Sequence, residues 1–173
     1  MDFNKKFEFF TKDGIPYQIK KITHADKITI ENGFFQLSEK SIMFRFLELK
    51  KNLSEKELEY LSSPDWVKHV AFGAGIDEDG KRLGIGVARY IKIDDFSAEV
   101  AVTVIDRFQS QGVGKNLIKI LIDYAKESKI KFLVGTVNCY NYPMLNILKK
   151  YPEIELKVDS SNYEVKFNLD KFN

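Results

Sequence analysis

The chain has 173 residues and a mass of 20.1 kDa, the size of one domain that can bury its own hydrophobic core. Hydrophobic residues make up 44% and charged residues 30% of the sequence, which excludes a disordered or fibrous chain. Because 27 Lys and Arg face 25 Asp and Glu, the net charge is only +2, and we expect no nucleic-acid partner. No apolar run approaches the ~20 residues of a membrane span, and the N-terminus lacks the apolar core of a signal peptide. We therefore expect a cytoplasmic protein without a membrane partner.

Cysteine and histidine are too few to indicate a metal site. Cys139 is the single cysteine, which excludes an internal disulfide, and His24 and His69 are the two histidines. Their spacing matches no set of metal ligands, so we expect no metal ion.

The N-terminal part of the chain predicts a hairpin followed by helical segments. Two strand-like runs, 7–10 and 17–22, flank Lys12-Asp13-Gly14, which is typical of a turn. Between residues 26 and 51 the apolar positions are irregularly spaced, which allows helices without defining their ends.

The middle of the chain changes from a helical to a strand-like pattern. The segment Ser54–Glu57 has the sequence of a capping box and predicts a short helix that ends before Pro64. Three runs rich in β-branched residues follow at 70–76, 83–93 and 98–105. Short turns separate these runs, so they predict a three-stranded antiparallel meander.

The last third of the chain alternates helices and strands. Helical spacing is clear at 112–129 and weaker at 143–150, and 132–137 reads as a strand between them. A final hairpin is predicted from 154–158 and 163–169. Because a strand, a helix and a strand follow one another, a right-handed crossover should join two parallel strands. The fold class is therefore α/β (α+β), as a single domain with a mixed sheet.

The stretch from Gln109 to Lys115 carries two glycines, Gly112 and Gly114, between a strand and a helix. Glycine lets the backbone approach a ligand, and the first N–H groups of a helix lack intrahelical partners, so this loop can hold an anion such as pyrophosphate. A tight strand-to-helix turn is the alternative interpretation. The region 107–131 contains six basic and two acidic residues, and this local excess of positive charge favours the anion site.

Two nucleotide-binding patterns are excluded. A P-loop needs four residues between its glycines and a hydroxyl after its lysine, whereas one residue separates Gly112 from Gly114 and Asn116 follows Lys115. The dinucleotide-binding fingerprint needs a third glycine where this chain has Leu117.

The pattern that remains, Gln109-x-x-Gly112-x-Gly114 after a strand bearing Glu99, resembles the acetyl-CoA pyrophosphate signature of the GNAT superfamily of N-acetyltransferases. The resemblance is strongest from Ala98 to Lys150. It implies acetyl-CoA as cosubstrate and a GNAT-like mixed, mostly antiparallel sheet flanked by helices, with a parallel strand pair around the CoA cleft. The single domain, 1–173, would then comprise an N-terminal hairpin (1–22), an acetyl-CoA-binding core (98–150) and a C-terminal hairpin (153–170).

The resemblance also implies which residues bind the cofactor. Backbone N–H groups of the loop would hold the pyrophosphate, the preceding strand would pair with the pantetheine arm, and an Asn that opens the next helix would contact the cofactor. Taken alone, that Asn is equally well interpreted as a helix N-cap. The residues are Val102, Thr103, Val104, Gln109, Ser110, Gln111, Gly112, Val113, Gly114, Lys115, Asn116 and Asn141.

Further stretches resemble the bacterial Pat-type protein lysine acetyltransferases. They are Leu37–Phe46, Leu53–Leu58, Pro64–Ala71 and Gly86–Tyr90. This resemblance implies a protein lysine as the acetyl acceptor. A small-molecule amine or a polyamine is an alternative acceptor, and a noncatalytic acyl-CoA-binding module that regulates another protein is an alternative function. The oligomeric state is not indicated.

The expected chemistry requires a base, because a lysine with a pKa of ~10.4 is protonated at neutral pH and only a neutral amine attacks a thioester. Glu99 is the one carboxylate in an apolar strand, so we expect it to be the catalytic base, with a pKa raised by desolvation. A Glu that faces water is the alternative. The backbone N–H of Val104 could hold the oxyanion.

Many members of the superfamily use a tyrosine as general acid at the position that Leu148 occupies here, so the resemblance assigns no acid. Nearby tyrosines are Tyr140, Tyr142 and Tyr151. Arg45, Arg89 and His69 stand in otherwise apolar segments, and we expect them to be hydrogen-bonded or ion-paired, with a role in the substrate cleft as the alternative.

Overall fold

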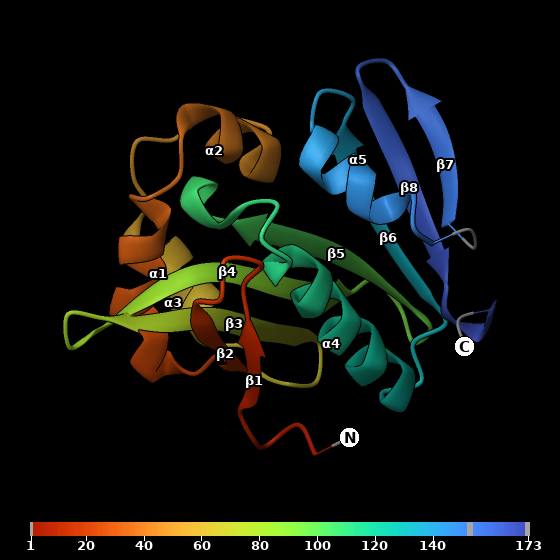
Figure 1. Ribbon diagram of the computed structural model, residues 1–173. Coiled ribbons are helices and arrows are strands. Elements are labelled where there is room, and N and C mark those ends of the chain that lie inside the picture. The colour runs from red at the N-terminus through yellow and green to blue at the C-terminus, as the bar shows by residue number, and fades with distance from the viewer. Residues whose placement is uncertain (1, 152–153, 172–173) are drawn as a thin grey trace.

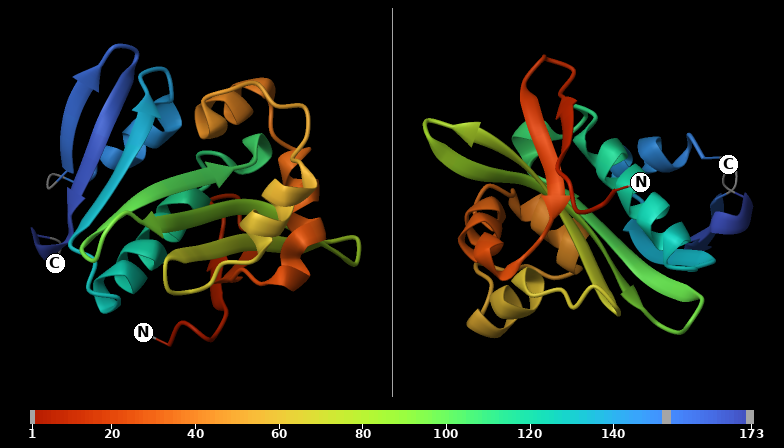
Figure 2. Two further views of the ribbon diagram at one scale, coloured as in Figure 1. Left: turned by 180° about the vertical axis from the view of Figure 1, so that it is seen from behind. Right: turned by 90° about the horizontal axis from the view of Figure 1, so that it is seen from below.

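A computed structural model describes residues 2–151 and 154–171. Within these residues the strands form one eight-stranded sheet in the order β1-β2-β3-β4-β5-β6-β8-β7, with helices on both faces (Figures 1 and 2). The strands are β1 (Phe7–Phe10), β2 (Pro16–Lys21), β3 (His69–Glu78), β4 (Lys81–Lys92), β5 (Ser97–Val104), β6 (Phe132–Asn138), β7 (Ile154–Asp159) and β8 (Asn162–Asn168). The α-helices are α1 (Lys27–Phe34), α2 (Glu39–Phe46), α3 (Glu55–Ser62), α4 (Val113–Glu127) and α5 (Tyr142–Leu148). No helix in the described part of the chain is long and apolar enough to cross a membrane.

The topology confirms the mixed sheet. Neighbouring strands are antiparallel except for β5 and β6, which are parallel and are connected through α4. The segment 26–51, whose helices could not be delimited from sequence, contains α1 and α2. The predicted hairpins are present, although residue 153, where the C-terminal hairpin region was expected to begin, lies outside the described residues.

The parallel contact between β5 and β6 is short. It comprises Ser97 with Phe132, Ala98 with Leu133 and Glu99 with Val134. Beyond Glu99 the two strands diverge, while β5 stays paired with β4 up to Val104 and β6 stays paired with β8 up to Asn138. A wedge-shaped opening therefore forms inside the sheet rather than at its edge.

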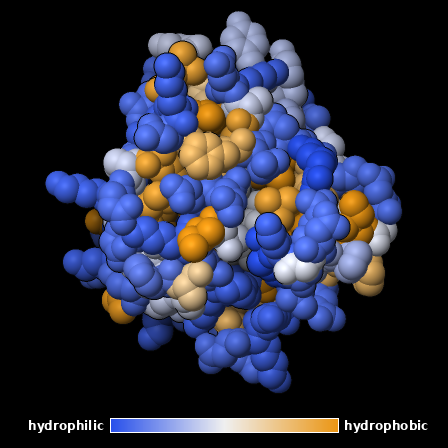
Figure 3. All heavy atoms as spheres, turned by 90° about the vertical axis from the view of Figure 1, so that its left-hand side faces the viewer, coloured by the Kyte–Doolittle hydropathy of each residue, from blue (hydrophilic) through white to orange (hydrophobic). Residues whose placement is uncertain are grey.

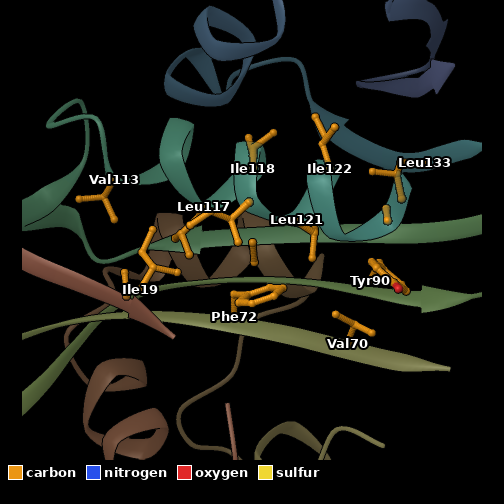
Figure 4. Close-up of a cluster of buried hydrophobic side chains, with 14 of the residues drawn as sticks. Ile19, Val70, Phe72, Tyr90, Val113, Leu117, Ile118, Leu121, Ile122 and Leu133 are labelled. Atoms are coloured by element: carbon orange, nitrogen blue, oxygen red, sulfur yellow. The ribbon is translucent and has the colours of Figure 1, made fainter. Parts of the chain in front are cut away.

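The largest hydrophobic core lies between α4 and the sheet. Leu117 and Leu121 of α4 point toward Phe72 of β3 and Tyr90 of β4, as Figure 4 shows. All four side chains are at most 1% exposed. The three- and four-residue spacing of apolar positions along α4 thus places one face of this helix against the sheet.

The opposite face of the sheet is covered by α1, α2 and α3. A smaller cluster of Phe34, Ile42, Leu53 and Leu58 holds these helices together. Alternation along β4 assigns its side chains to the two faces: Ala88 and Tyr90 belong to the α4 core, so residues 87 and 89 face α1–α3.

Asp106, just after β5, fixes the position of α2. Its carboxylate accepts hydrogen bonds from the Ser38 N–H at 2.8 Å, the Ser38 hydroxyl at 2.7 Å and the Ser41 hydroxyl at 3.0 Å. Ser38 also caps α2 by accepting from the Ser41 N–H. Helix α2 is therefore held against the end of the strand that carries the site.

His69 of β3 and Arg89 of β4 form a buried polar contact beneath α3. Arg89 is 4% and His69 is 5% exposed, and Arg89 Nη1 lies 2.9 Å from His69 Nε2. Burial and the positive charge of Arg89 lower the pKa of His69 to about 4, so the imidazole is neutral at pH 7 and Nε2 accepts from Arg89. The hydrogen-bonded role expected for both residues is confirmed.

Truncation of the α4 core should destabilise the fold. We expect Leu121→Ala to lower the free energy of unfolding by about 2–5 kcal/mol, because it removes buried methyl groups and leaves a cavity. Urea denaturation measures the change. Leu49→Ala is the matched control, since Leu49 is 69% exposed, and it should change stability by less than about 0.5 kcal/mol. A similar loss in both variants would contradict the assigned core.

The His69 contact should make stability sensitive to acid. The folded pKa of about 4 lies below the ordinary value of 6.5, so the unfolded chain takes up this proton first. The contribution is present above about pH 6.5 and is lost as pH falls toward 4, by roughly 2–3 kcal/mol. Urea denaturation at about pH 7.5 and about pH 4.5 tests this. His69→Gln keeps an acceptor for Arg89 without titrating, and it should lose less stability between the two pH values; an equal loss would refute the assignment.

Candidate active site

The loop between β5 and α4 presents free N–H groups. Gly112 precedes α4 with a φ of 93°, and Ser110 also has a positive φ of 61°. No heavy atom lies within 4 Å of the position that a Cβ on Gly112 would take, so the backbone is open there. The N–H groups of Val113, Gly114 and Lys115, in the first turn of α4, have no intrahelical partner. This arrangement suits an anion.

The side chain of Gln109 anchors the loop. Its Nε2 donates to the carbonyl oxygen of Val104 at 3.1 Å and to the hydroxyl of Ser41 at 3.0 Å. The loop is thereby tied both to the end of β5 and to α2. The Gln109 N–H also donates to the Asp106 carbonyl at 3.2 Å, so this residue shapes the loop, while the free N–H groups lie further on, at the start of α4.

The β1–β2 hairpin supports the loop from the other side. Gln111 Nε2 donates to Asp13 Oδ2 at 2.6 Å, and the Lys12 N–H donates to the Gln111 carbonyl at 3.2 Å. Asn116 Nδ2 donates to the hydroxyl of Tyr17 at 2.8 Å. Sequence reasoning missed this support, because the partners of the two side-chain contacts lie 98 and 99 positions apart.

A groove of about 530 Å³ runs along the loop, α2 and α5. Its charged lining residues are Lys12, Arg45, Lys115 and Lys150, and within the described residues no Asp or Glu lines it. Eleven of the expected cofactor residues line the groove: Val102, Thr103, Val104, Gln109, Ser110, Gln111, Gly112, Gly114, Lys115, Asn116 and Asn141. The side chain of the twelfth, Val113, is buried in the core, so only its backbone N–H can contribute.

Beyond its contact with β6, strand β5 has one free edge. The Ile105 N–H donates to the Ile85 carbonyl of the β4 segment at 3.0 Å, and alternate residues of an antiparallel strand face their partner. Val102 and Val104 therefore turn their backbone groups away from β4, toward the opening. Their N–H groups are available to a ligand in the groove.

Thr103 differs from its two neighbours. Its carbonyl oxygen faces β4, where it lies 3.0 Å from the position that a Cβ on Gly86 would take. The expectation that the Thr103 backbone pairs with the cofactor is wrong, because pairing with Val87 of β4 occupies it. The side chain of Thr103 lines the groove instead.

Glu99 lies at the last paired position of β5, opposite Val134, where the strands begin to diverge. Its side chain is exposed, so the desolvation expected from the apolar sequence around it is absent. Alternation along β5 places Glu99 with Ala101 and Thr103 on the sheet face toward α1–α3. Burial lowers the pKa of Arg45, and the negative charge of Glu99 opposes that shift.

Asn141, the helix-opening residue that was expected to contact the cofactor, is the N-cap of α5. Its Oδ1 accepts from the Met144 N–H at 3.3 Å, and its side chain also lines the groove. Leu148 is buried beside the opening between β5 and β6. Tyr140 and Tyr142 are each 61% exposed, and no tyrosine of the described chain lines the groove or the opening. The site therefore presents a carboxylate and backbone donors but no phenol.

Comparisons with known proteins agree with this geometry. The model of the acetyltransferase (GNAT) family matches residues 40–151. An acetyltransferase of Pseudomonas aeruginosa is 28% identical over 136 residues, which cover 78% of this chain and 73% of that protein.

The structure is also similar to solved acetyltransferase folds. The GNAT domain of S. lividans PAT superposes with a TM-score of 0.85 at 24% identity, over 94% of this chain and 96% of that one. A putative acetyltransferase, yncA of Salmonella typhimurium, solved with its cofactor acetyl-CoA, gives 0.68 at 14% identity over 90% and 95%. A cAMP-binding acyltransferase of Mycobacterium smegmatis gives 0.66 at 21% identity, over 96% of this chain and 48% of that one. The chain belongs to the acetyltransferase (GNAT) family and is an N-acetyltransferase whose cosubstrate is acetyl-CoA.

Proposed function

We propose that this enzyme acetylates lysine side chains of a protein in the cytoplasm, by direct attack of the amine on acetyl-CoA with Glu99 as general base. The similarity to the PAT GNAT domain and the Pat-like segments of the sequence support a protein acceptor. The observation that carries the mechanism is the divergence of β5 from β6 immediately after Glu99.

The charged and hydrogen-bonding groups of the groove match the successive parts of acetyl-CoA. Free N–H groups at the start of α4 and the unopposed cations Lys12, Lys115 and Lys150 suit its phosphates. The free edge of β5 at Val102 and Val104 suits the amide-rich pantetheine arm, which can add to the strand as another strand would. The thioester would then lie in the opening, close to Glu99.

Glu99 would act first, by accepting a proton from the ammonium group of the lysine. The neutral amine then forms a bond to the thioester carbon, and the carbonyl oxygen becomes an oxyanion. The Val104 N–H is a preorganised donor for that oxyanion, since its own carbonyl is bound by Gln109 and its N–H faces the opening. Collapse of the intermediate breaks the carbon–sulfur bond and releases CoA. The nitrogen of the intermediate gives its second proton to water as this bond breaks, and, because no tyrosine of the described chain lines the site, the thiolate takes its proton from water. Glu99 then returns the first proton to solvent, so that one proton is released for each acetyl group transferred.

Two other functions give different experimental results. A small-molecule amine or polyamine acceptor would produce CoA release with such amines and none with lysine peptides. A noncatalytic acyl-CoA-binding module would bind acetyl-CoA but would not release CoA, whichever amine is offered. Isothermal titration with acetyl-CoA, followed by thiol-release assays on panels of lysine peptides and polyamines, separates the three. Release with polyamines alone would refute the protein acceptor.

Glu99→Gln tests the base. We expect acetyl-CoA affinity to be retained, because the carboxylate lies at the opening rather than at the phosphate loop, while kcat on an amine falls by ~10²–10⁴. Asp95→Asn, an exposed carboxylate in the β4–β5 turn, is the matched control and should keep full turnover. Unchanged kcat in Glu99→Gln would remove this residue from the mechanism.

Gly112→Ala tests the anion loop. Alanine at a φ of 93° is strained, so the loop should lose its geometry and stability should fall by roughly 1 kcal/mol. We expect KM for acetyl-CoA to rise more than tenfold, with a smaller effect on the acceptor KM. Gly80→Ala is a control, since Gly80 also has a positive φ, of 73°, but lies in the distant β3–β4 turn. Equal acetyl-CoA affinity in both variants would contradict the role of the loop.

A further inference from the structure

A second cavity, of about 100 Å³, lies between the sheet and α1–α3, on the face opposite α4. We name it the arginine cavity, because Arg45, Arg82 and Arg89 line it. Arg45 and Thr103 also line the acetyl-CoA groove, and Arg45 lines the opening that contains Glu99. The arginine cavity therefore adjoins both the groove and the opening, with Arg45 common to all three.

The charges that line this cavity are unbalanced. Two of its cations are paired with carboxylates: Lys20 with Asp26 at 2.6 Å, and Arg82 with Asp77 at 3.2 Å. Arg45 and Arg89 have no carboxylate within 4 Å among the residues that the structure describes. The cavity thus holds two guanidinium groups without an ion-pair partner in contact within the described chain, and the charge of Glu99 acts on Arg45 only from beyond 4 Å.

Arg89 has hydrogen-bond donors to spare. Nη1 donates to His69 and to the Leu61 carbonyl, and Nη2 donates to the same carbonyl at 3.3 Å. These bonds use three of its five N–H donors, so the Nε–H and one Nη2–H have no partner in the described chain. Burial and the nearby charge of Arg45 lower the pKa of Arg89 to about 9, in keeping with the lack, among the described residues, of a carboxylate in contact with it.

The Arg45 side chain makes even fewer polar contacts than that of Arg89. Its guanidinium lies 5.0 Å from the centre of the Phe46 ring, and within the described residues it makes no side-chain hydrogen bond. Arg89 is buried and Arg45 is half-buried, and a guanidinium withdrawn from water without an anion in contact is unfavourable, so an incoming anion would stabilise both arginines.

We propose that the arginine cavity binds a carboxylate of the acceptor, held by Arg45 and Arg89, while the amine of the same molecule lies beside Glu99. This inference rests on the proposed function. A guanidinium matches the two oxygens of a carboxylate, and the apolar lining around the arginines, which includes Ile22, Phe34 and Leu61, suits a short hydrocarbon stem. The acceptor class is therefore an amine with a carboxylate close by.

Two sources could supply that chemistry: an Asp or Glu near the reacting lysine of a protein, or a free amino acid. The surface favours the protein. Figure 3 shows the side of the molecule where α1 and α2 lie, with hydrophobic residues among hydrophilic ones. Exposed apolar side chains in this region are Ile28, Phe35, Leu47 and Leu49, which suit contact with a polypeptide.

Matched acceptors test the proposal. Lysine peptides with Glu or Asp at each position near the lysine are compared with the same peptides carrying Gln or Asn, and an amino acid is compared with its amide. We expect the best acidic peptide to have a kcat/KM about 10- to 100-fold above its neutral partner, the effect of a charged hydrogen-bonded pair. Preference for the amino acid over every peptide would keep the carboxylate site but assign it to a small acceptor.

Arg45→Gln should abolish this discrimination without unfolding the protein, since Arg45 makes no hydrogen bond to lose, and Arg45→Lys should retain part of it. Arg89→Lys is the second variant, with stability checked by urea denaturation. Arg107→Gln is the control: it removes the same charge from an exposed arginine paired with Glu78 at 2.8 Å, and discrimination should persist. A preference for the acidic over the neutral peptide that survives both Arg45→Gln and Arg89→Lys would overturn the proposal. The proposal would also fail if Arg45→Gln lowered acetyl-CoA affinity by as large a factor as it lowered kcat/KM.

Direct titration separates this inference from the proposed function. The acidic peptide is titrated into the wild-type protein and into Arg45→Gln, without acetyl-CoA. Arg45-dependent binding without CoA release in the assay would retain the carboxylate site and reject the protein acceptor. Release of CoA with equal kcat/KM for acidic and neutral peptides would retain the function and reject the site.

Discussion

The divergence of β5 from β6 after three paired residues is the constraint on which the site depends. Each strand is fixed on its outer side, β5 by seven residue pairs with β4 and β6 by seven with β8, so the sheet can open between them without losing either strand. The opening exposes the N–H groups of Val102 and Val104, which a fully paired strand would have used. It also places Glu99 at the point where the opening begins. Unsatisfied backbone donors and a carboxylate along one opening suit a thioester and an amine that meet within it.

In the proposed reaction, the acceptor carboxylate binds on one face of the sheet, and the pyrophosphate of acetyl-CoA binds at the start of the helix that covers the other face. Helix α4 starts at the anion loop and covers one face, while α1–α3 cover the other and form the arginine cavity. Helix α2 connects the two regions. Its Ser41 is bound both by Asp106 and by Gln109 of the loop, and Arg45, one turn further along, lines both the groove and the cavity. Ordering of the loop by acetyl-CoA would therefore also restrict α2, and with it the arginine that faces the acceptor.

Local patterns were sufficient for much of the fold. The capping box at Ser54, the apolar spacing of α4 and the strand-turn-strand repeats each depend on neighbours in sequence, and each element is present. The signature loop was recognisable for the same reason. What escaped prediction depends on distant partners: the support of Gln111 and Asn116 by the N-terminal hairpin, and the joining of Arg45 and Arg89 in one cavity. Glu99 shows the opposite error, because its apolar neighbours in sequence suggested burial that the divergence of the strands removes.

The net charge of +2 is an average, and positive charge is concentrated in the groove and in the arginine cavity. Four cations and no carboxylate of the described residues line the groove. In the arginine cavity, the Arg89 guanidinium donates to a neutral His69 and to the Leu61 carbonyl instead of to a carboxylate. Positive charge beside an acceptor ammonium favours its neutral form, the form that attacks a thioester. Arg45 would thus assist Glu99 in removing the proton, since one destabilises the ammonium and the other accepts its proton. A carboxylate on the acceptor would moderate this repulsion while the substrate binds, and so allow a cationic amine to enter a cationic site.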